Sequence, residues 1–244
     1  MQQYCELPTP KGIVRGFFHH PNIDQFPVCI IFHGFTGNKT GTKFSYVQLA
    51  RMLEAKGIAT LRMDFLGSGD SDLNFIDMTF DDEVSCARVM LEEMLQMPQV
   101  TKVYLLGHSM GGAVASELAK LYPADIQKLC LWAPAFNLPD AVAYIKGNVP
   151  ESASYDHNGF EISNDFVKDI TSRDLYQALD KYQNELMVIH GTADMTVPFA
   201  ISKKYLACFK KDILFYPIPD GSHNFDKLSD IKQVMKLSLD FLSE

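Results

Sequence analysis

The sequence is notable first for what it lacks. No apolar run approaches the roughly 18–20 residues that a membrane-spanning helix needs, and no basic stretch followed by an apolar one opens the chain. Lys and Arg together number 22 against 30 Asp and Glu, a net charge of −8, which argues against nucleic acid or an anionic membrane as a partner. We therefore expect a cytoplasmic protein that acts on a neutral or modestly charged small molecule.

Cysteine is also sparse, and its pattern excludes several kinds of site. The five cysteines are odd in number, scattered, and form no Cys-x-x-Cys pair. Two of them, Cys29 and Cys130, lie within apolar strand-like runs. We expect the cysteines to be small core residues rather than disulfide partners or metal ligands.

Apolar strand-like runs alternate with amphipathic segments along most of the 244 residues. The chain begins with a predicted hairpin, and four strand–helix repeats follow before residue 134, which predicts a mostly parallel, doubly wound α/β sheet. One domain covering 1–244 fits this length. The sequence predicts strands over residues 4–7, 13–19, 28–32, 58–63, 102–106, 126–133, 186–190 and 213–216, and helices over 44–56, 79–97, 109–121, 201–209 and 227–242.

The alternation stops between residues 134 and 184, a stretch much longer than a simple crossover requires. We interpret 135–183 as an insertion that folds over the sheet edge as a lid, with a helix over 164–182. The insertion mixes aromatic with polar residues, and most of the aromatic side chains are expected to anchor the lid to the body.

The pentapeptide Gly107-His108-Ser109-Met110-Gly111 joins a predicted strand to a predicted helix rich in small residues. This context is typical of a nucleophile elbow, a sharp turn that exposes a serine hydroxyl. The alternative is a glycine-rich turn with an incidental serine. If Ser109 is the nucleophile, the Met110 amide is one oxyanion donor.

A second glycine loop, His33-Gly34-Phe35, directly follows the strand over 28–32. Because loops at the carboxyl ends of parallel strands form the ligand sites of open α/β sheets, the Phe35 amide is the other candidate oxyanion donor. A tight turn without chemical use is the alternative. Asp64, in the glycine-rich loop after the next strand, is expected to shape that loop rather than to catalyse.

A serine nucleophile needs a base and an orienting acid. Of seven histidines, His223 alone lies in a loop after the last strand and before the final helix. Asp194 follows another strand and falls between Ser109 and His223, as the order serine, acid, histidine requires. Asp220, three residues before His223, is the rival acid. We therefore predict a catalytic triad of Ser109, Asp194 and His223.

These motifs, together with Val197-Pro198 and Gly221-Ser222-His223, resemble those of the α/β-hydrolase superfamily over nearly the whole chain. Within it, Gly12-Ile13-Val14-Arg15-Gly16 and Leu131-Trp132-Ala133-Pro134-Ala135 resemble bacterial feruloyl/cinnamoyl esterases. The resemblance implies an α/β-hydrolase fold with helices on both faces of the sheet and a small lid. It also implies hydrolysis of hydroxycinnamic esters through an acyl-enzyme, without metal or organic cofactor, with Phe136 and Asp140 as substrate-binding residues.

Two other functions are alternatives to this one, and a third is excluded by the serine at the elbow. A lipase, monoacylglycerol lipase or thioesterase would act on aliphatic acyl groups, and a larger and more uniformly apolar lid would favour it. A non-catalytic binding protein of the same fold could retain the triad. A haloalkane dehalogenase would need an aspartate where Ser109 stands. A homodimer is compatible with the sequence, which identifies neither the natural ester nor its alcohol.

Overall fold

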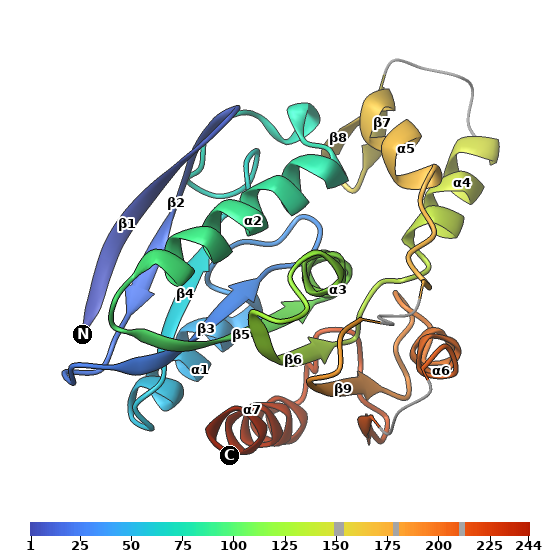
Figure 1. Cartoon of the computed structure of the whole chain (residues 1–244). Helices are drawn as coiled ribbons and strands as arrows, with labels where there is room; N and C mark the ends of the chain where they lie inside the picture. Colours follow the sequence, from blue (N-terminus) through green and yellow to red (C-terminus); the bar gives the residue numbers. More distant parts are fainter. Residues whose placement is uncertain (149–153, 178–180, 210–212) are drawn as a thin grey trace.

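A mixed eight-stranded sheet forms the centre of the computed structural model, which describes residues 1–148, 154–177, 181–209 and 213–244 (Figure 1). Within these ranges, β1 and β2 pair antiparallel, β2 pairs antiparallel with β4, and every other neighbouring pair is parallel. The strands, in spatial order, are β1 (Gln2–Thr9), β2 (Gly12–His19), β4 (Ala59–Met63), β3 (Phe26–Phe32), β5 (Val100–His108), β6 (Ile126–Trp132), β9 (Glu185–Gly191) and β10 (Leu214–Ile218).

The inner strands are buried on both faces, as parallel strands covered by helices must be. Along β3, Val28 and Ile30 enter one hydrophobic cluster, whereas Cys29 and Ile31 enter the cluster on the opposite face. Of the cysteines, Cys29, Cys86 and Cys130 are buried as predicted, Cys5 is half-buried, and Cys208 is exposed instead.

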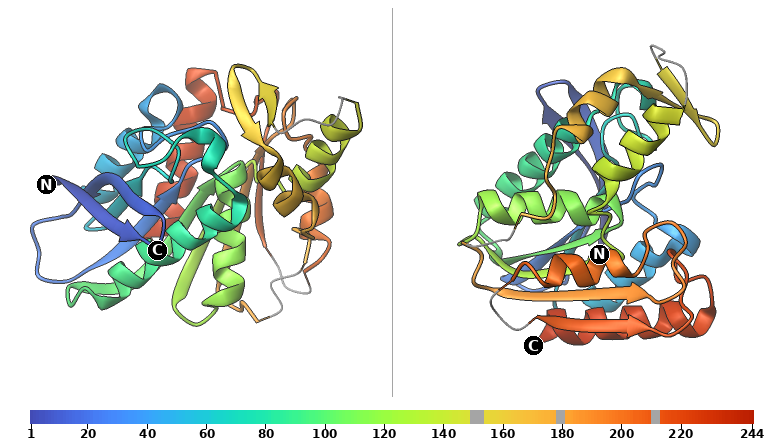
Figure 2. Two further views of the ribbon diagram at one scale, coloured as in Figure 1. Left: turned by 90° about the horizontal axis from the view of Figure 1, so that it is seen from above. Right: turned by 90° about the vertical axis from the view of Figure 1, so that its right-hand side faces the viewer.

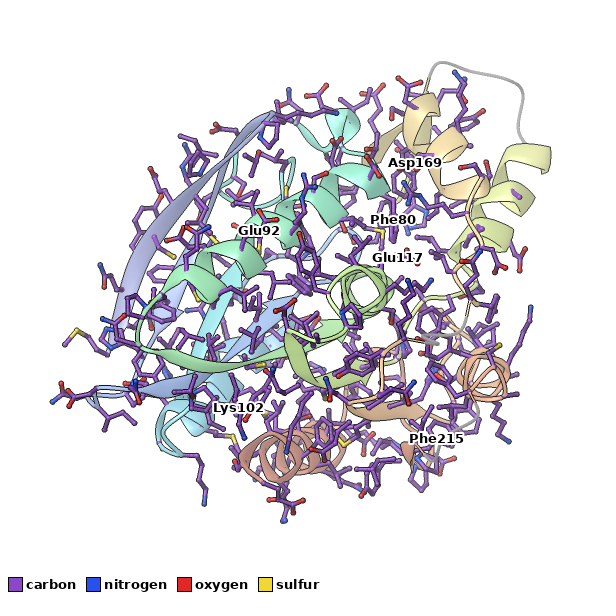
Figure 3. All side chains as sticks on the ribbon, viewed as in Figure 1. Phe80, Glu92, Lys102, Glu117, Asp169 and Phe215 are labelled. Carbon is purple, nitrogen blue, oxygen red and sulfur yellow. The ribbon has the colours of Figure 1, made fainter. Side chains whose placement is uncertain are left out.

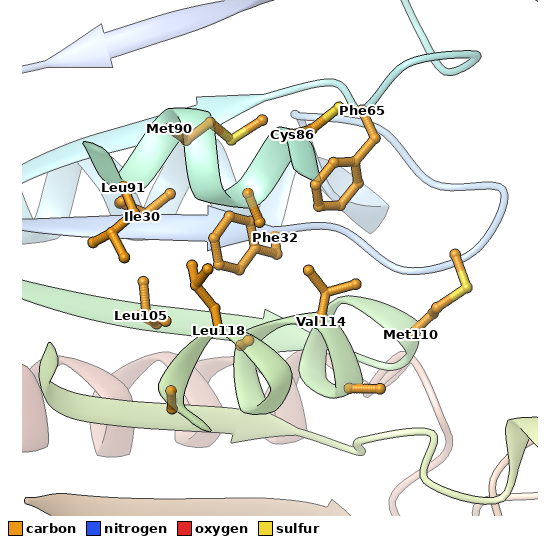
Figure 4. Packing of buried hydrophobic residues seen from close by; sticks show 14 of the residues in the cluster. Ile30, Phe32, Phe65, Cys86, Met90, Leu91, Leu105, Met110, Val114 and Leu118 are labelled. Atoms are coloured by element: carbon orange, nitrogen blue, oxygen red, sulfur yellow. The ribbon is translucent and has the colours of Figure 1, made fainter. Parts of the chain in front are cut away.

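Helices cover both faces of the sheet, as Figures 1 and 2 show. One face carries α2 (Phe80–Gln96) and α3 (Met110–Leu121), and the other carries α1 (Ser45–Glu54) and α7 (Leu228–Ser243). Figure 4 shows Leu91 of α2 and Leu118 of α3 packed against Ile30 and Leu105 of the sheet. The short helix α6 (Ala200–Leu206) follows β9.

Thr79 begins α2 with the capping box that the sequence predicts. Its hydroxyl accepts a hydrogen bond from the Asp82 amide, and the Asp82 carboxylate accepts one from the Thr79 amide. Two backbone donors that the helix leaves free are satisfied in this way. The prediction of this helix from residue 79 to 97 is confirmed to within one residue at each end.

The segment between β6 and β9 is an insertion with its own small sheet. It holds α4 (Leu138–Asn148), the hairpin β7 (Ser154–His157) and β8 (Phe160–Ser163), and α5 (Asn164–Thr171). The hairpin was not predicted. The helix predicted over 164–182 ends at Thr171, and residues 178–180 of it lie outside the described residues.

The end of α5 is fixed by contacts with α2. The guanidinium of Arg173 lies over the Phe80 ring and pairs with Asp169 of α5 and Asp81 of α2. Figure 3 shows Phe80 and Asp169 side by side at this contact. The insertion therefore rests on α2 as well as on the edge where the strands end. Along the described ranges, none of the helices combines the length and the apolar character that crossing a membrane requires.

Candidate active site

Ser109 occupies a strained turn between β5 and α3. Its φ of 57° and ψ of −122° lie in a region that side chains rarely adopt. The turn is possible because Gly107 and Gly111 flank it: a β-carbon on Gly107 would collide with the carbonyl of Gly111, and one on Gly111 with the carbonyl of Phe32. The local sequence therefore forces the serine hydroxyl out of the sheet, as expected of an elbow.

Three loops at the carboxyl ends of β5, β9 and β10 bring Ser109, Asp194 and His223 together. The Ser109 hydroxyl is 2.9 Å from His223 Nε2, and His223 Nδ1 is 2.6 Å from Asp194 Oδ2. The side chain of Asp194 is 0% exposed and that of His223 is 12% exposed. With a proton on Nδ1 directed at the carboxylate, Nε2 is free to accept the serine proton.

Hydrogen bonds keep Asp194 ionised despite its burial. Burial alone would raise the pKa of this carboxyl group, but hydrogen bonds from His190 and His223 outweigh burial and hold the pKa well below its usual range. The other oxygen, Oδ1, accepts from the amides of Thr196 and Val197, each at 2.8 Å. A buried anion therefore faces the imidazole of His223.

The rival acid Asp220 and the nearby Asp226 are placed elsewhere. Asp220 is exposed, and its amide donates to Thr192. Asp226 accepts from the Ser222 hydroxyl and pairs with Lys43. Asp194 is thus the carboxylate that the structure sets against His223.

His108 makes its hydrogen bonds away from the serine hydroxyl. Its Nε2 is 3.1 Å from the carbonyl oxygen of His223, and its Nδ1 is 3.1 Å from the Tyr46 hydroxyl. Burial, helped by the nearby His223, lowers the pKa of His108 to about 3. This histidine is therefore neutral near pH 7 and ties the His223 loop to the elbow.

The loop after β3 places a second backbone amide near Ser109. A β-carbon on Gly34 would lie 2.9 Å from Ser109 Cβ, so the two loops are in contact. Among the described residues, neither the Phe35 amide nor the Met110 amide finds an acceptor in the protein. Two free N–H groups beside a serine hydroxyl are what an oxyanion requires.

Asp64 anchors this loop and has the structural role expected of it. Its fully buried carboxylate accepts from the Lys39 amide at 2.6 Å and forms an ion pair with Lys39 Nζ at 2.5 Å. His33 adds a second tie, because its Nε2 accepts from the Phe65 amide. The loop that carries Phe35 is thereby fastened to the loop after β4.

Two cavities of different character meet at Ser109. A cavity of about 190 Å³ extends under the insertion and is mostly apolar, whereas a cavity of about 500 Å³ is mostly polar and also borders His223. Both are bordered by Phe35, Ser109, His157 and Thr196. We call them the apolar cavity and the polar cavity. The apolar cavity is lined by those four residues and by Met110, Ala135, Asn137, Leu138, Ala141, Val142, Tyr155, Ile162, Phe166, Val167 and Val197.

Two residues that line the apolar cavity carry a polar atom without a partner. The side-chain oxygen of Asn137 and the hydroxyl of Tyr155 are both buried, and neither finds a hydrogen-bond partner within the described ranges. Tyr155 is only 8% exposed. Such unpaired buried groups cost free energy, and a bound ligand that hydrogen-bonds with them would recover it.

The two residues expected to bind substrate do not line either cavity. The ring of Phe136 is 1% exposed and stacks on Tyr205 with ring centroids 3.6 Å apart. Asp140 is exposed in the first turn of α4. Leu138, Ala141 and Val142 form the face of α4 that borders the cavity, and Asp140 lies on the opposite face.

His157 and Thr196 were missed as site residues in the sequence. His157 ends β7, and its ring lies 5.7 Å from that of Phe35. The signal for its hairpin was present in Asn158-Gly159, whose φ angles of 53° and 86° are those of a tight hairpin turn. Thr196 lies two residues beyond Asp194, on the same loop. In the described part of the chain, no group of three or more His, Cys, Asp or Glu side chains is arranged to hold a metal.

Comparison with known proteins identifies relatives among hydrolases. The chain is 29% identical over 175 residues to Lipase 1 of Psychrobacter immobilis, an overlap of 71% of this chain and 49% of the lipase. It is 24% identical over 176 residues to the monoacylglycerol lipase of Mycolicibacterium smegmatis, covering 70% of this chain and 59% of that enzyme. The chain thus spans about half the length of these curated relatives.

Among solved structures, Est1E of Butyrivibrio proteoclasticus with ferulic acid bound superposes with a TM-score of 0.87. The sequences are 24% identical, and the match covers 98% of this chain and 100% of the other. This likeness shows that the fold is the same. The model of the family described as serine aminopeptidase, S33, matches residues 24–174, more than half of the sequence. The chain therefore has the α/β-hydrolase fold and belongs to this serine hydrolase family.

Proposed function

We propose that the protein is a serine hydrolase of carboxylic esters. The observation that carries the proposal is the relay from the Ser109 hydroxyl to His223 Nε2 at 2.9 Å, and from His223 Nδ1 to the buried Asp194 at 2.6 Å. The free amides of Phe35 and Met110 beside it complete the requirements for acyl transfer.

The reaction proceeds in two steps. Ser109 Oγ attacks the ester carbonyl while its proton passes to His223 Nε2, and the amides of Phe35 and Met110 stabilise the oxyanion. The C–O bond to the alcohol then breaks, and the alcohol leaves with the proton from His223. Water next attacks the acyl-enzyme with His223 as base, which releases the carboxylic acid and restores Ser109.

The two cavities suggest how the ester is oriented. His223 borders the polar cavity but not the apolar one, and it must protonate the departing alcohol. We therefore assign the alcohol to the polar cavity and the acyl group to the apolar cavity. Thr36, Asn38, Asn158 and Asn224 on the polar side favour an alcohol that carries further hydroxyl groups.

We propose hydroxycinnamic acids, of the ferulic, coumaric or caffeic type, as the acyl group. A cavity of about 190 Å³ is small beside the ~300–1,000 Å³ of many ligand pockets, so it suits one planar aromatic acid. The Asn137 oxygen and the Tyr155 hydroxyl lack a partner among the described residues and belong to residues that line this cavity, and a ring hydroxyl would supply a hydrogen-bond partner. Est1E, with ferulic acid bound, has the same fold.

Lipase activity on aliphatic acyl groups is the second candidate, because the curated relatives include a lipase and a monoacylglycerol lipase. A long acyl chain would need more apolar volume, and it would leave Asn137 and Tyr155 unpaired. A peptidase that binds a free amino terminus would need a carboxylate, and none lines the apolar cavity in the described ranges.

A panel of kcat/KM values tests the proposal. The kcat/KM values for methyl ferulate and methyl p-coumarate should exceed the value for methyl cinnamate, which lacks the hydroxyl. They should also exceed the values for 4-nitrophenyl esters of long-chain fatty acids. Preference for long-chain esters would instead identify a lipase.

Two variants test the catalytic assignment separately from the acyl preference. Ser109→Ala should lower kcat by about 10³-fold or more and abolish labelling by a fluorophosphonate. Ser116→Ala, at a buried serine in α3, should keep that labelling. Asp194→Asn should lower kcat less than Ser109→Ala does and should leave KM similar. Absence of fluorophosphonate labelling in the natural protein would instead indicate a non-catalytic binding protein.

A further inference from the structure

A second histidine contacts the carboxylate of Asp194. His190 Nε2 lies 3.1 Å from Asp194 Oδ2, the same oxygen that faces His223 Nδ1 at 2.6 Å. The side chains of His190 and Asp194 are both 0% exposed. One carboxylate oxygen is therefore shared by two imidazoles, and only His223 has access to solvent, at 12% exposure.

The partners of His190 fix the position of its proton. Nε2 faces Asp194 Oδ2 and, at 2.9 Å, the carbonyl oxygen of Val197, and both of these can only accept. Nε2 must therefore carry hydrogen. Nδ1 lies 2.6 Å from the hydroxyl of Ser202, which is fully buried in α6 and can donate. The hydrogen bonds run from Ser202 to His190 and from His190 to Asp194.

The hydrogen bond from His190 changes the electrostatic effect of Asp194 on His223. Each N–H group that donates to Asp194 partly neutralises the negative charge of the carboxylate, which weakens its attraction for the proton on His223. It also limits rotation of the carboxylate. The amides of Thr196 and Val197 hold Oδ1, so His190 is the donor that acts on the oxygen facing His223.

We infer that His190 is a positioning residue for Asp194, which it holds in line with His223 while reducing the negative potential that His223 feels. The inference rests on the proposed function, because it assigns His223 as the catalytic base. Removing the Nε2–H of His190 should make the imidazolium form of His223 more stable. The acid limb of the activity profile should then move to higher pH.

The other charged or titratable groups near His223 and His190 are the same in the natural protein and in a variant that lacks the His190 donor. The ring of His108 lies tilted by 33° beside that of His223, with centroids 5.2 Å apart, and burial keeps it neutral. Asp226, paired with Lys43, lies in the loop of His223. Near His190, the Phe199 ring lies edge-on at 5.6 Å and separates it from Lys203, whose ammonium sits over that ring.

The test compares His190→Leu, which removes the donor, with His190→Gln, which keeps an N–H. The pH dependence of kcat/KM is measured with 4-nitrophenyl acetate, and the His223 ring is titrated by NMR, with its signal assigned through His223→Gln. His190→Leu should raise both apparent pKa values by about half a pH unit and lower kcat more than it changes KM. His190→Gln should restore the natural profile, and Ser202→Ala should shift it in the same direction by less.

A buried histidine far from the site supplies the control for general destabilisation. His19 is 1% exposed, and His19→Gln should lower stability without moving the pH profile. If His190→Leu lowers only the melting temperature and leaves the His223 titration unchanged, the inference is wrong. If the natural protein hydrolyses no ester, the proposed function fails, while the NMR titration still tests the effect of His190 on His223.

Discussion

Gly34 and Ser109 approach so closely that a β-carbon on Gly34 would lie 2.9 Å from Ser109 Cβ and 3.1 Å from the His108 carbonyl oxygen. The contact joins the loop that carries the Phe35 amide to the turn that carries the nucleophile. The distance between the two proposed oxyanion donors therefore depends on residue 34 having no side chain.

Gly34→Ala should separate these loops by a few tenths of an ångström. We expect kcat to fall by about 10–100-fold, because the Phe35 amide loses its alignment with the oxyanion, and KM to change little. Steady-state kinetics with 4-nitrophenyl acetate measure both. Gly57→Ala, where the nearest atom to an added β-carbon is 3.7 Å away, is the control: it should cost stability but not kcat. Equal kcat for Gly34→Ala and the natural protein would contradict the assignment of Phe35.

Tyr155→Phe tests the polar atoms of the apolar cavity. Losing the hydroxyl should lower kcat/KM for methyl p-coumarate by about 10-fold, the effect of one hydrogen bond, and should not change that for methyl cinnamate. Tyr176→Phe is a matched control, because the Tyr176 hydroxyl is also buried without a described partner but does not line the cavity. If Tyr155→Phe changes kcat/KM equally for both substrates, Tyr155 does not bind the ring hydroxyl.

Phe136→Leu should act on stability rather than on substrate binding. The stacked pair of Phe136 and Tyr205 joins the start of the insertion to α6, so the smaller side chain should lower the free energy of unfolding by about 1–2 kcal/mol. Denaturant unfolding measures this loss, and KM for methyl ferulate should stay within about twofold, because Phe136 makes no contact with the cavity. A selective rise in KM at unchanged stability would restore Phe136 as a substrate-binding residue.

His19 should make stability depend on pH below neutrality. Burial, together with the positive charge of Arg62, lowers its pKa from 6.5 to about 4. Above pH 6.5 the histidine is neutral in both the folded and the unfolded chain. As the pH falls from 6.5 to 4, only the unfolded chain takes up the proton, so stability is lost over this window, by roughly 2–3 kcal/mol.

The comparison of the natural protein with His19→Gln isolates this contribution. The glutamine cannot titrate, but its carbonyl can accept from Arg62 Nε, which is 3.0 Å from His19 Nε2. Urea unfolding at pH 7, 5.5 and 4 should show a smaller decline for the variant. Parallel declines in the two proteins would contradict the assignment.

The sheet and the predicted triad were accessible from sequence because their signals are local. An apolar strand, a glycine pair and a small-residue helix identify the elbow at Ser109 without knowledge of the rest of the chain. Chain order then restricts the acid and the base, since Asp194 and His223 each follow a strand whose carboxyl end must lie at the same edge. The structure brings these three side chains together in the predicted order.

The structure of the insertion was harder to predict from sequence, because its contacts depend on how its helices pack against the rest of the chain. Whether Asn137 or Asp140 faces the substrate depends on how α4 lies against the sheet, which the resemblance to esterases did not provide. Helical periodicity alone would have separated Asp140 from Leu138, Ala141 and Val142. The helix over 164–182 was overestimated because Arg173 turns to Asp81 of α2, a residue 92 positions away.

The meeting of the two cavities at Ser109 also bears on what can accept the acyl group. In the orientation proposed above, the acyl group remains in the apolar cavity once the first alcohol has left, and a nucleophile that His223 activates then approaches through the polar cavity. The polar cavity does not place water better for attack on the acyl-enzyme than it places another small hydroxyl compound. Added glycerol or methanol should therefore divert acyl groups into new esters, and the size and polarity of this entrance would set the balance between transfer and hydrolysis.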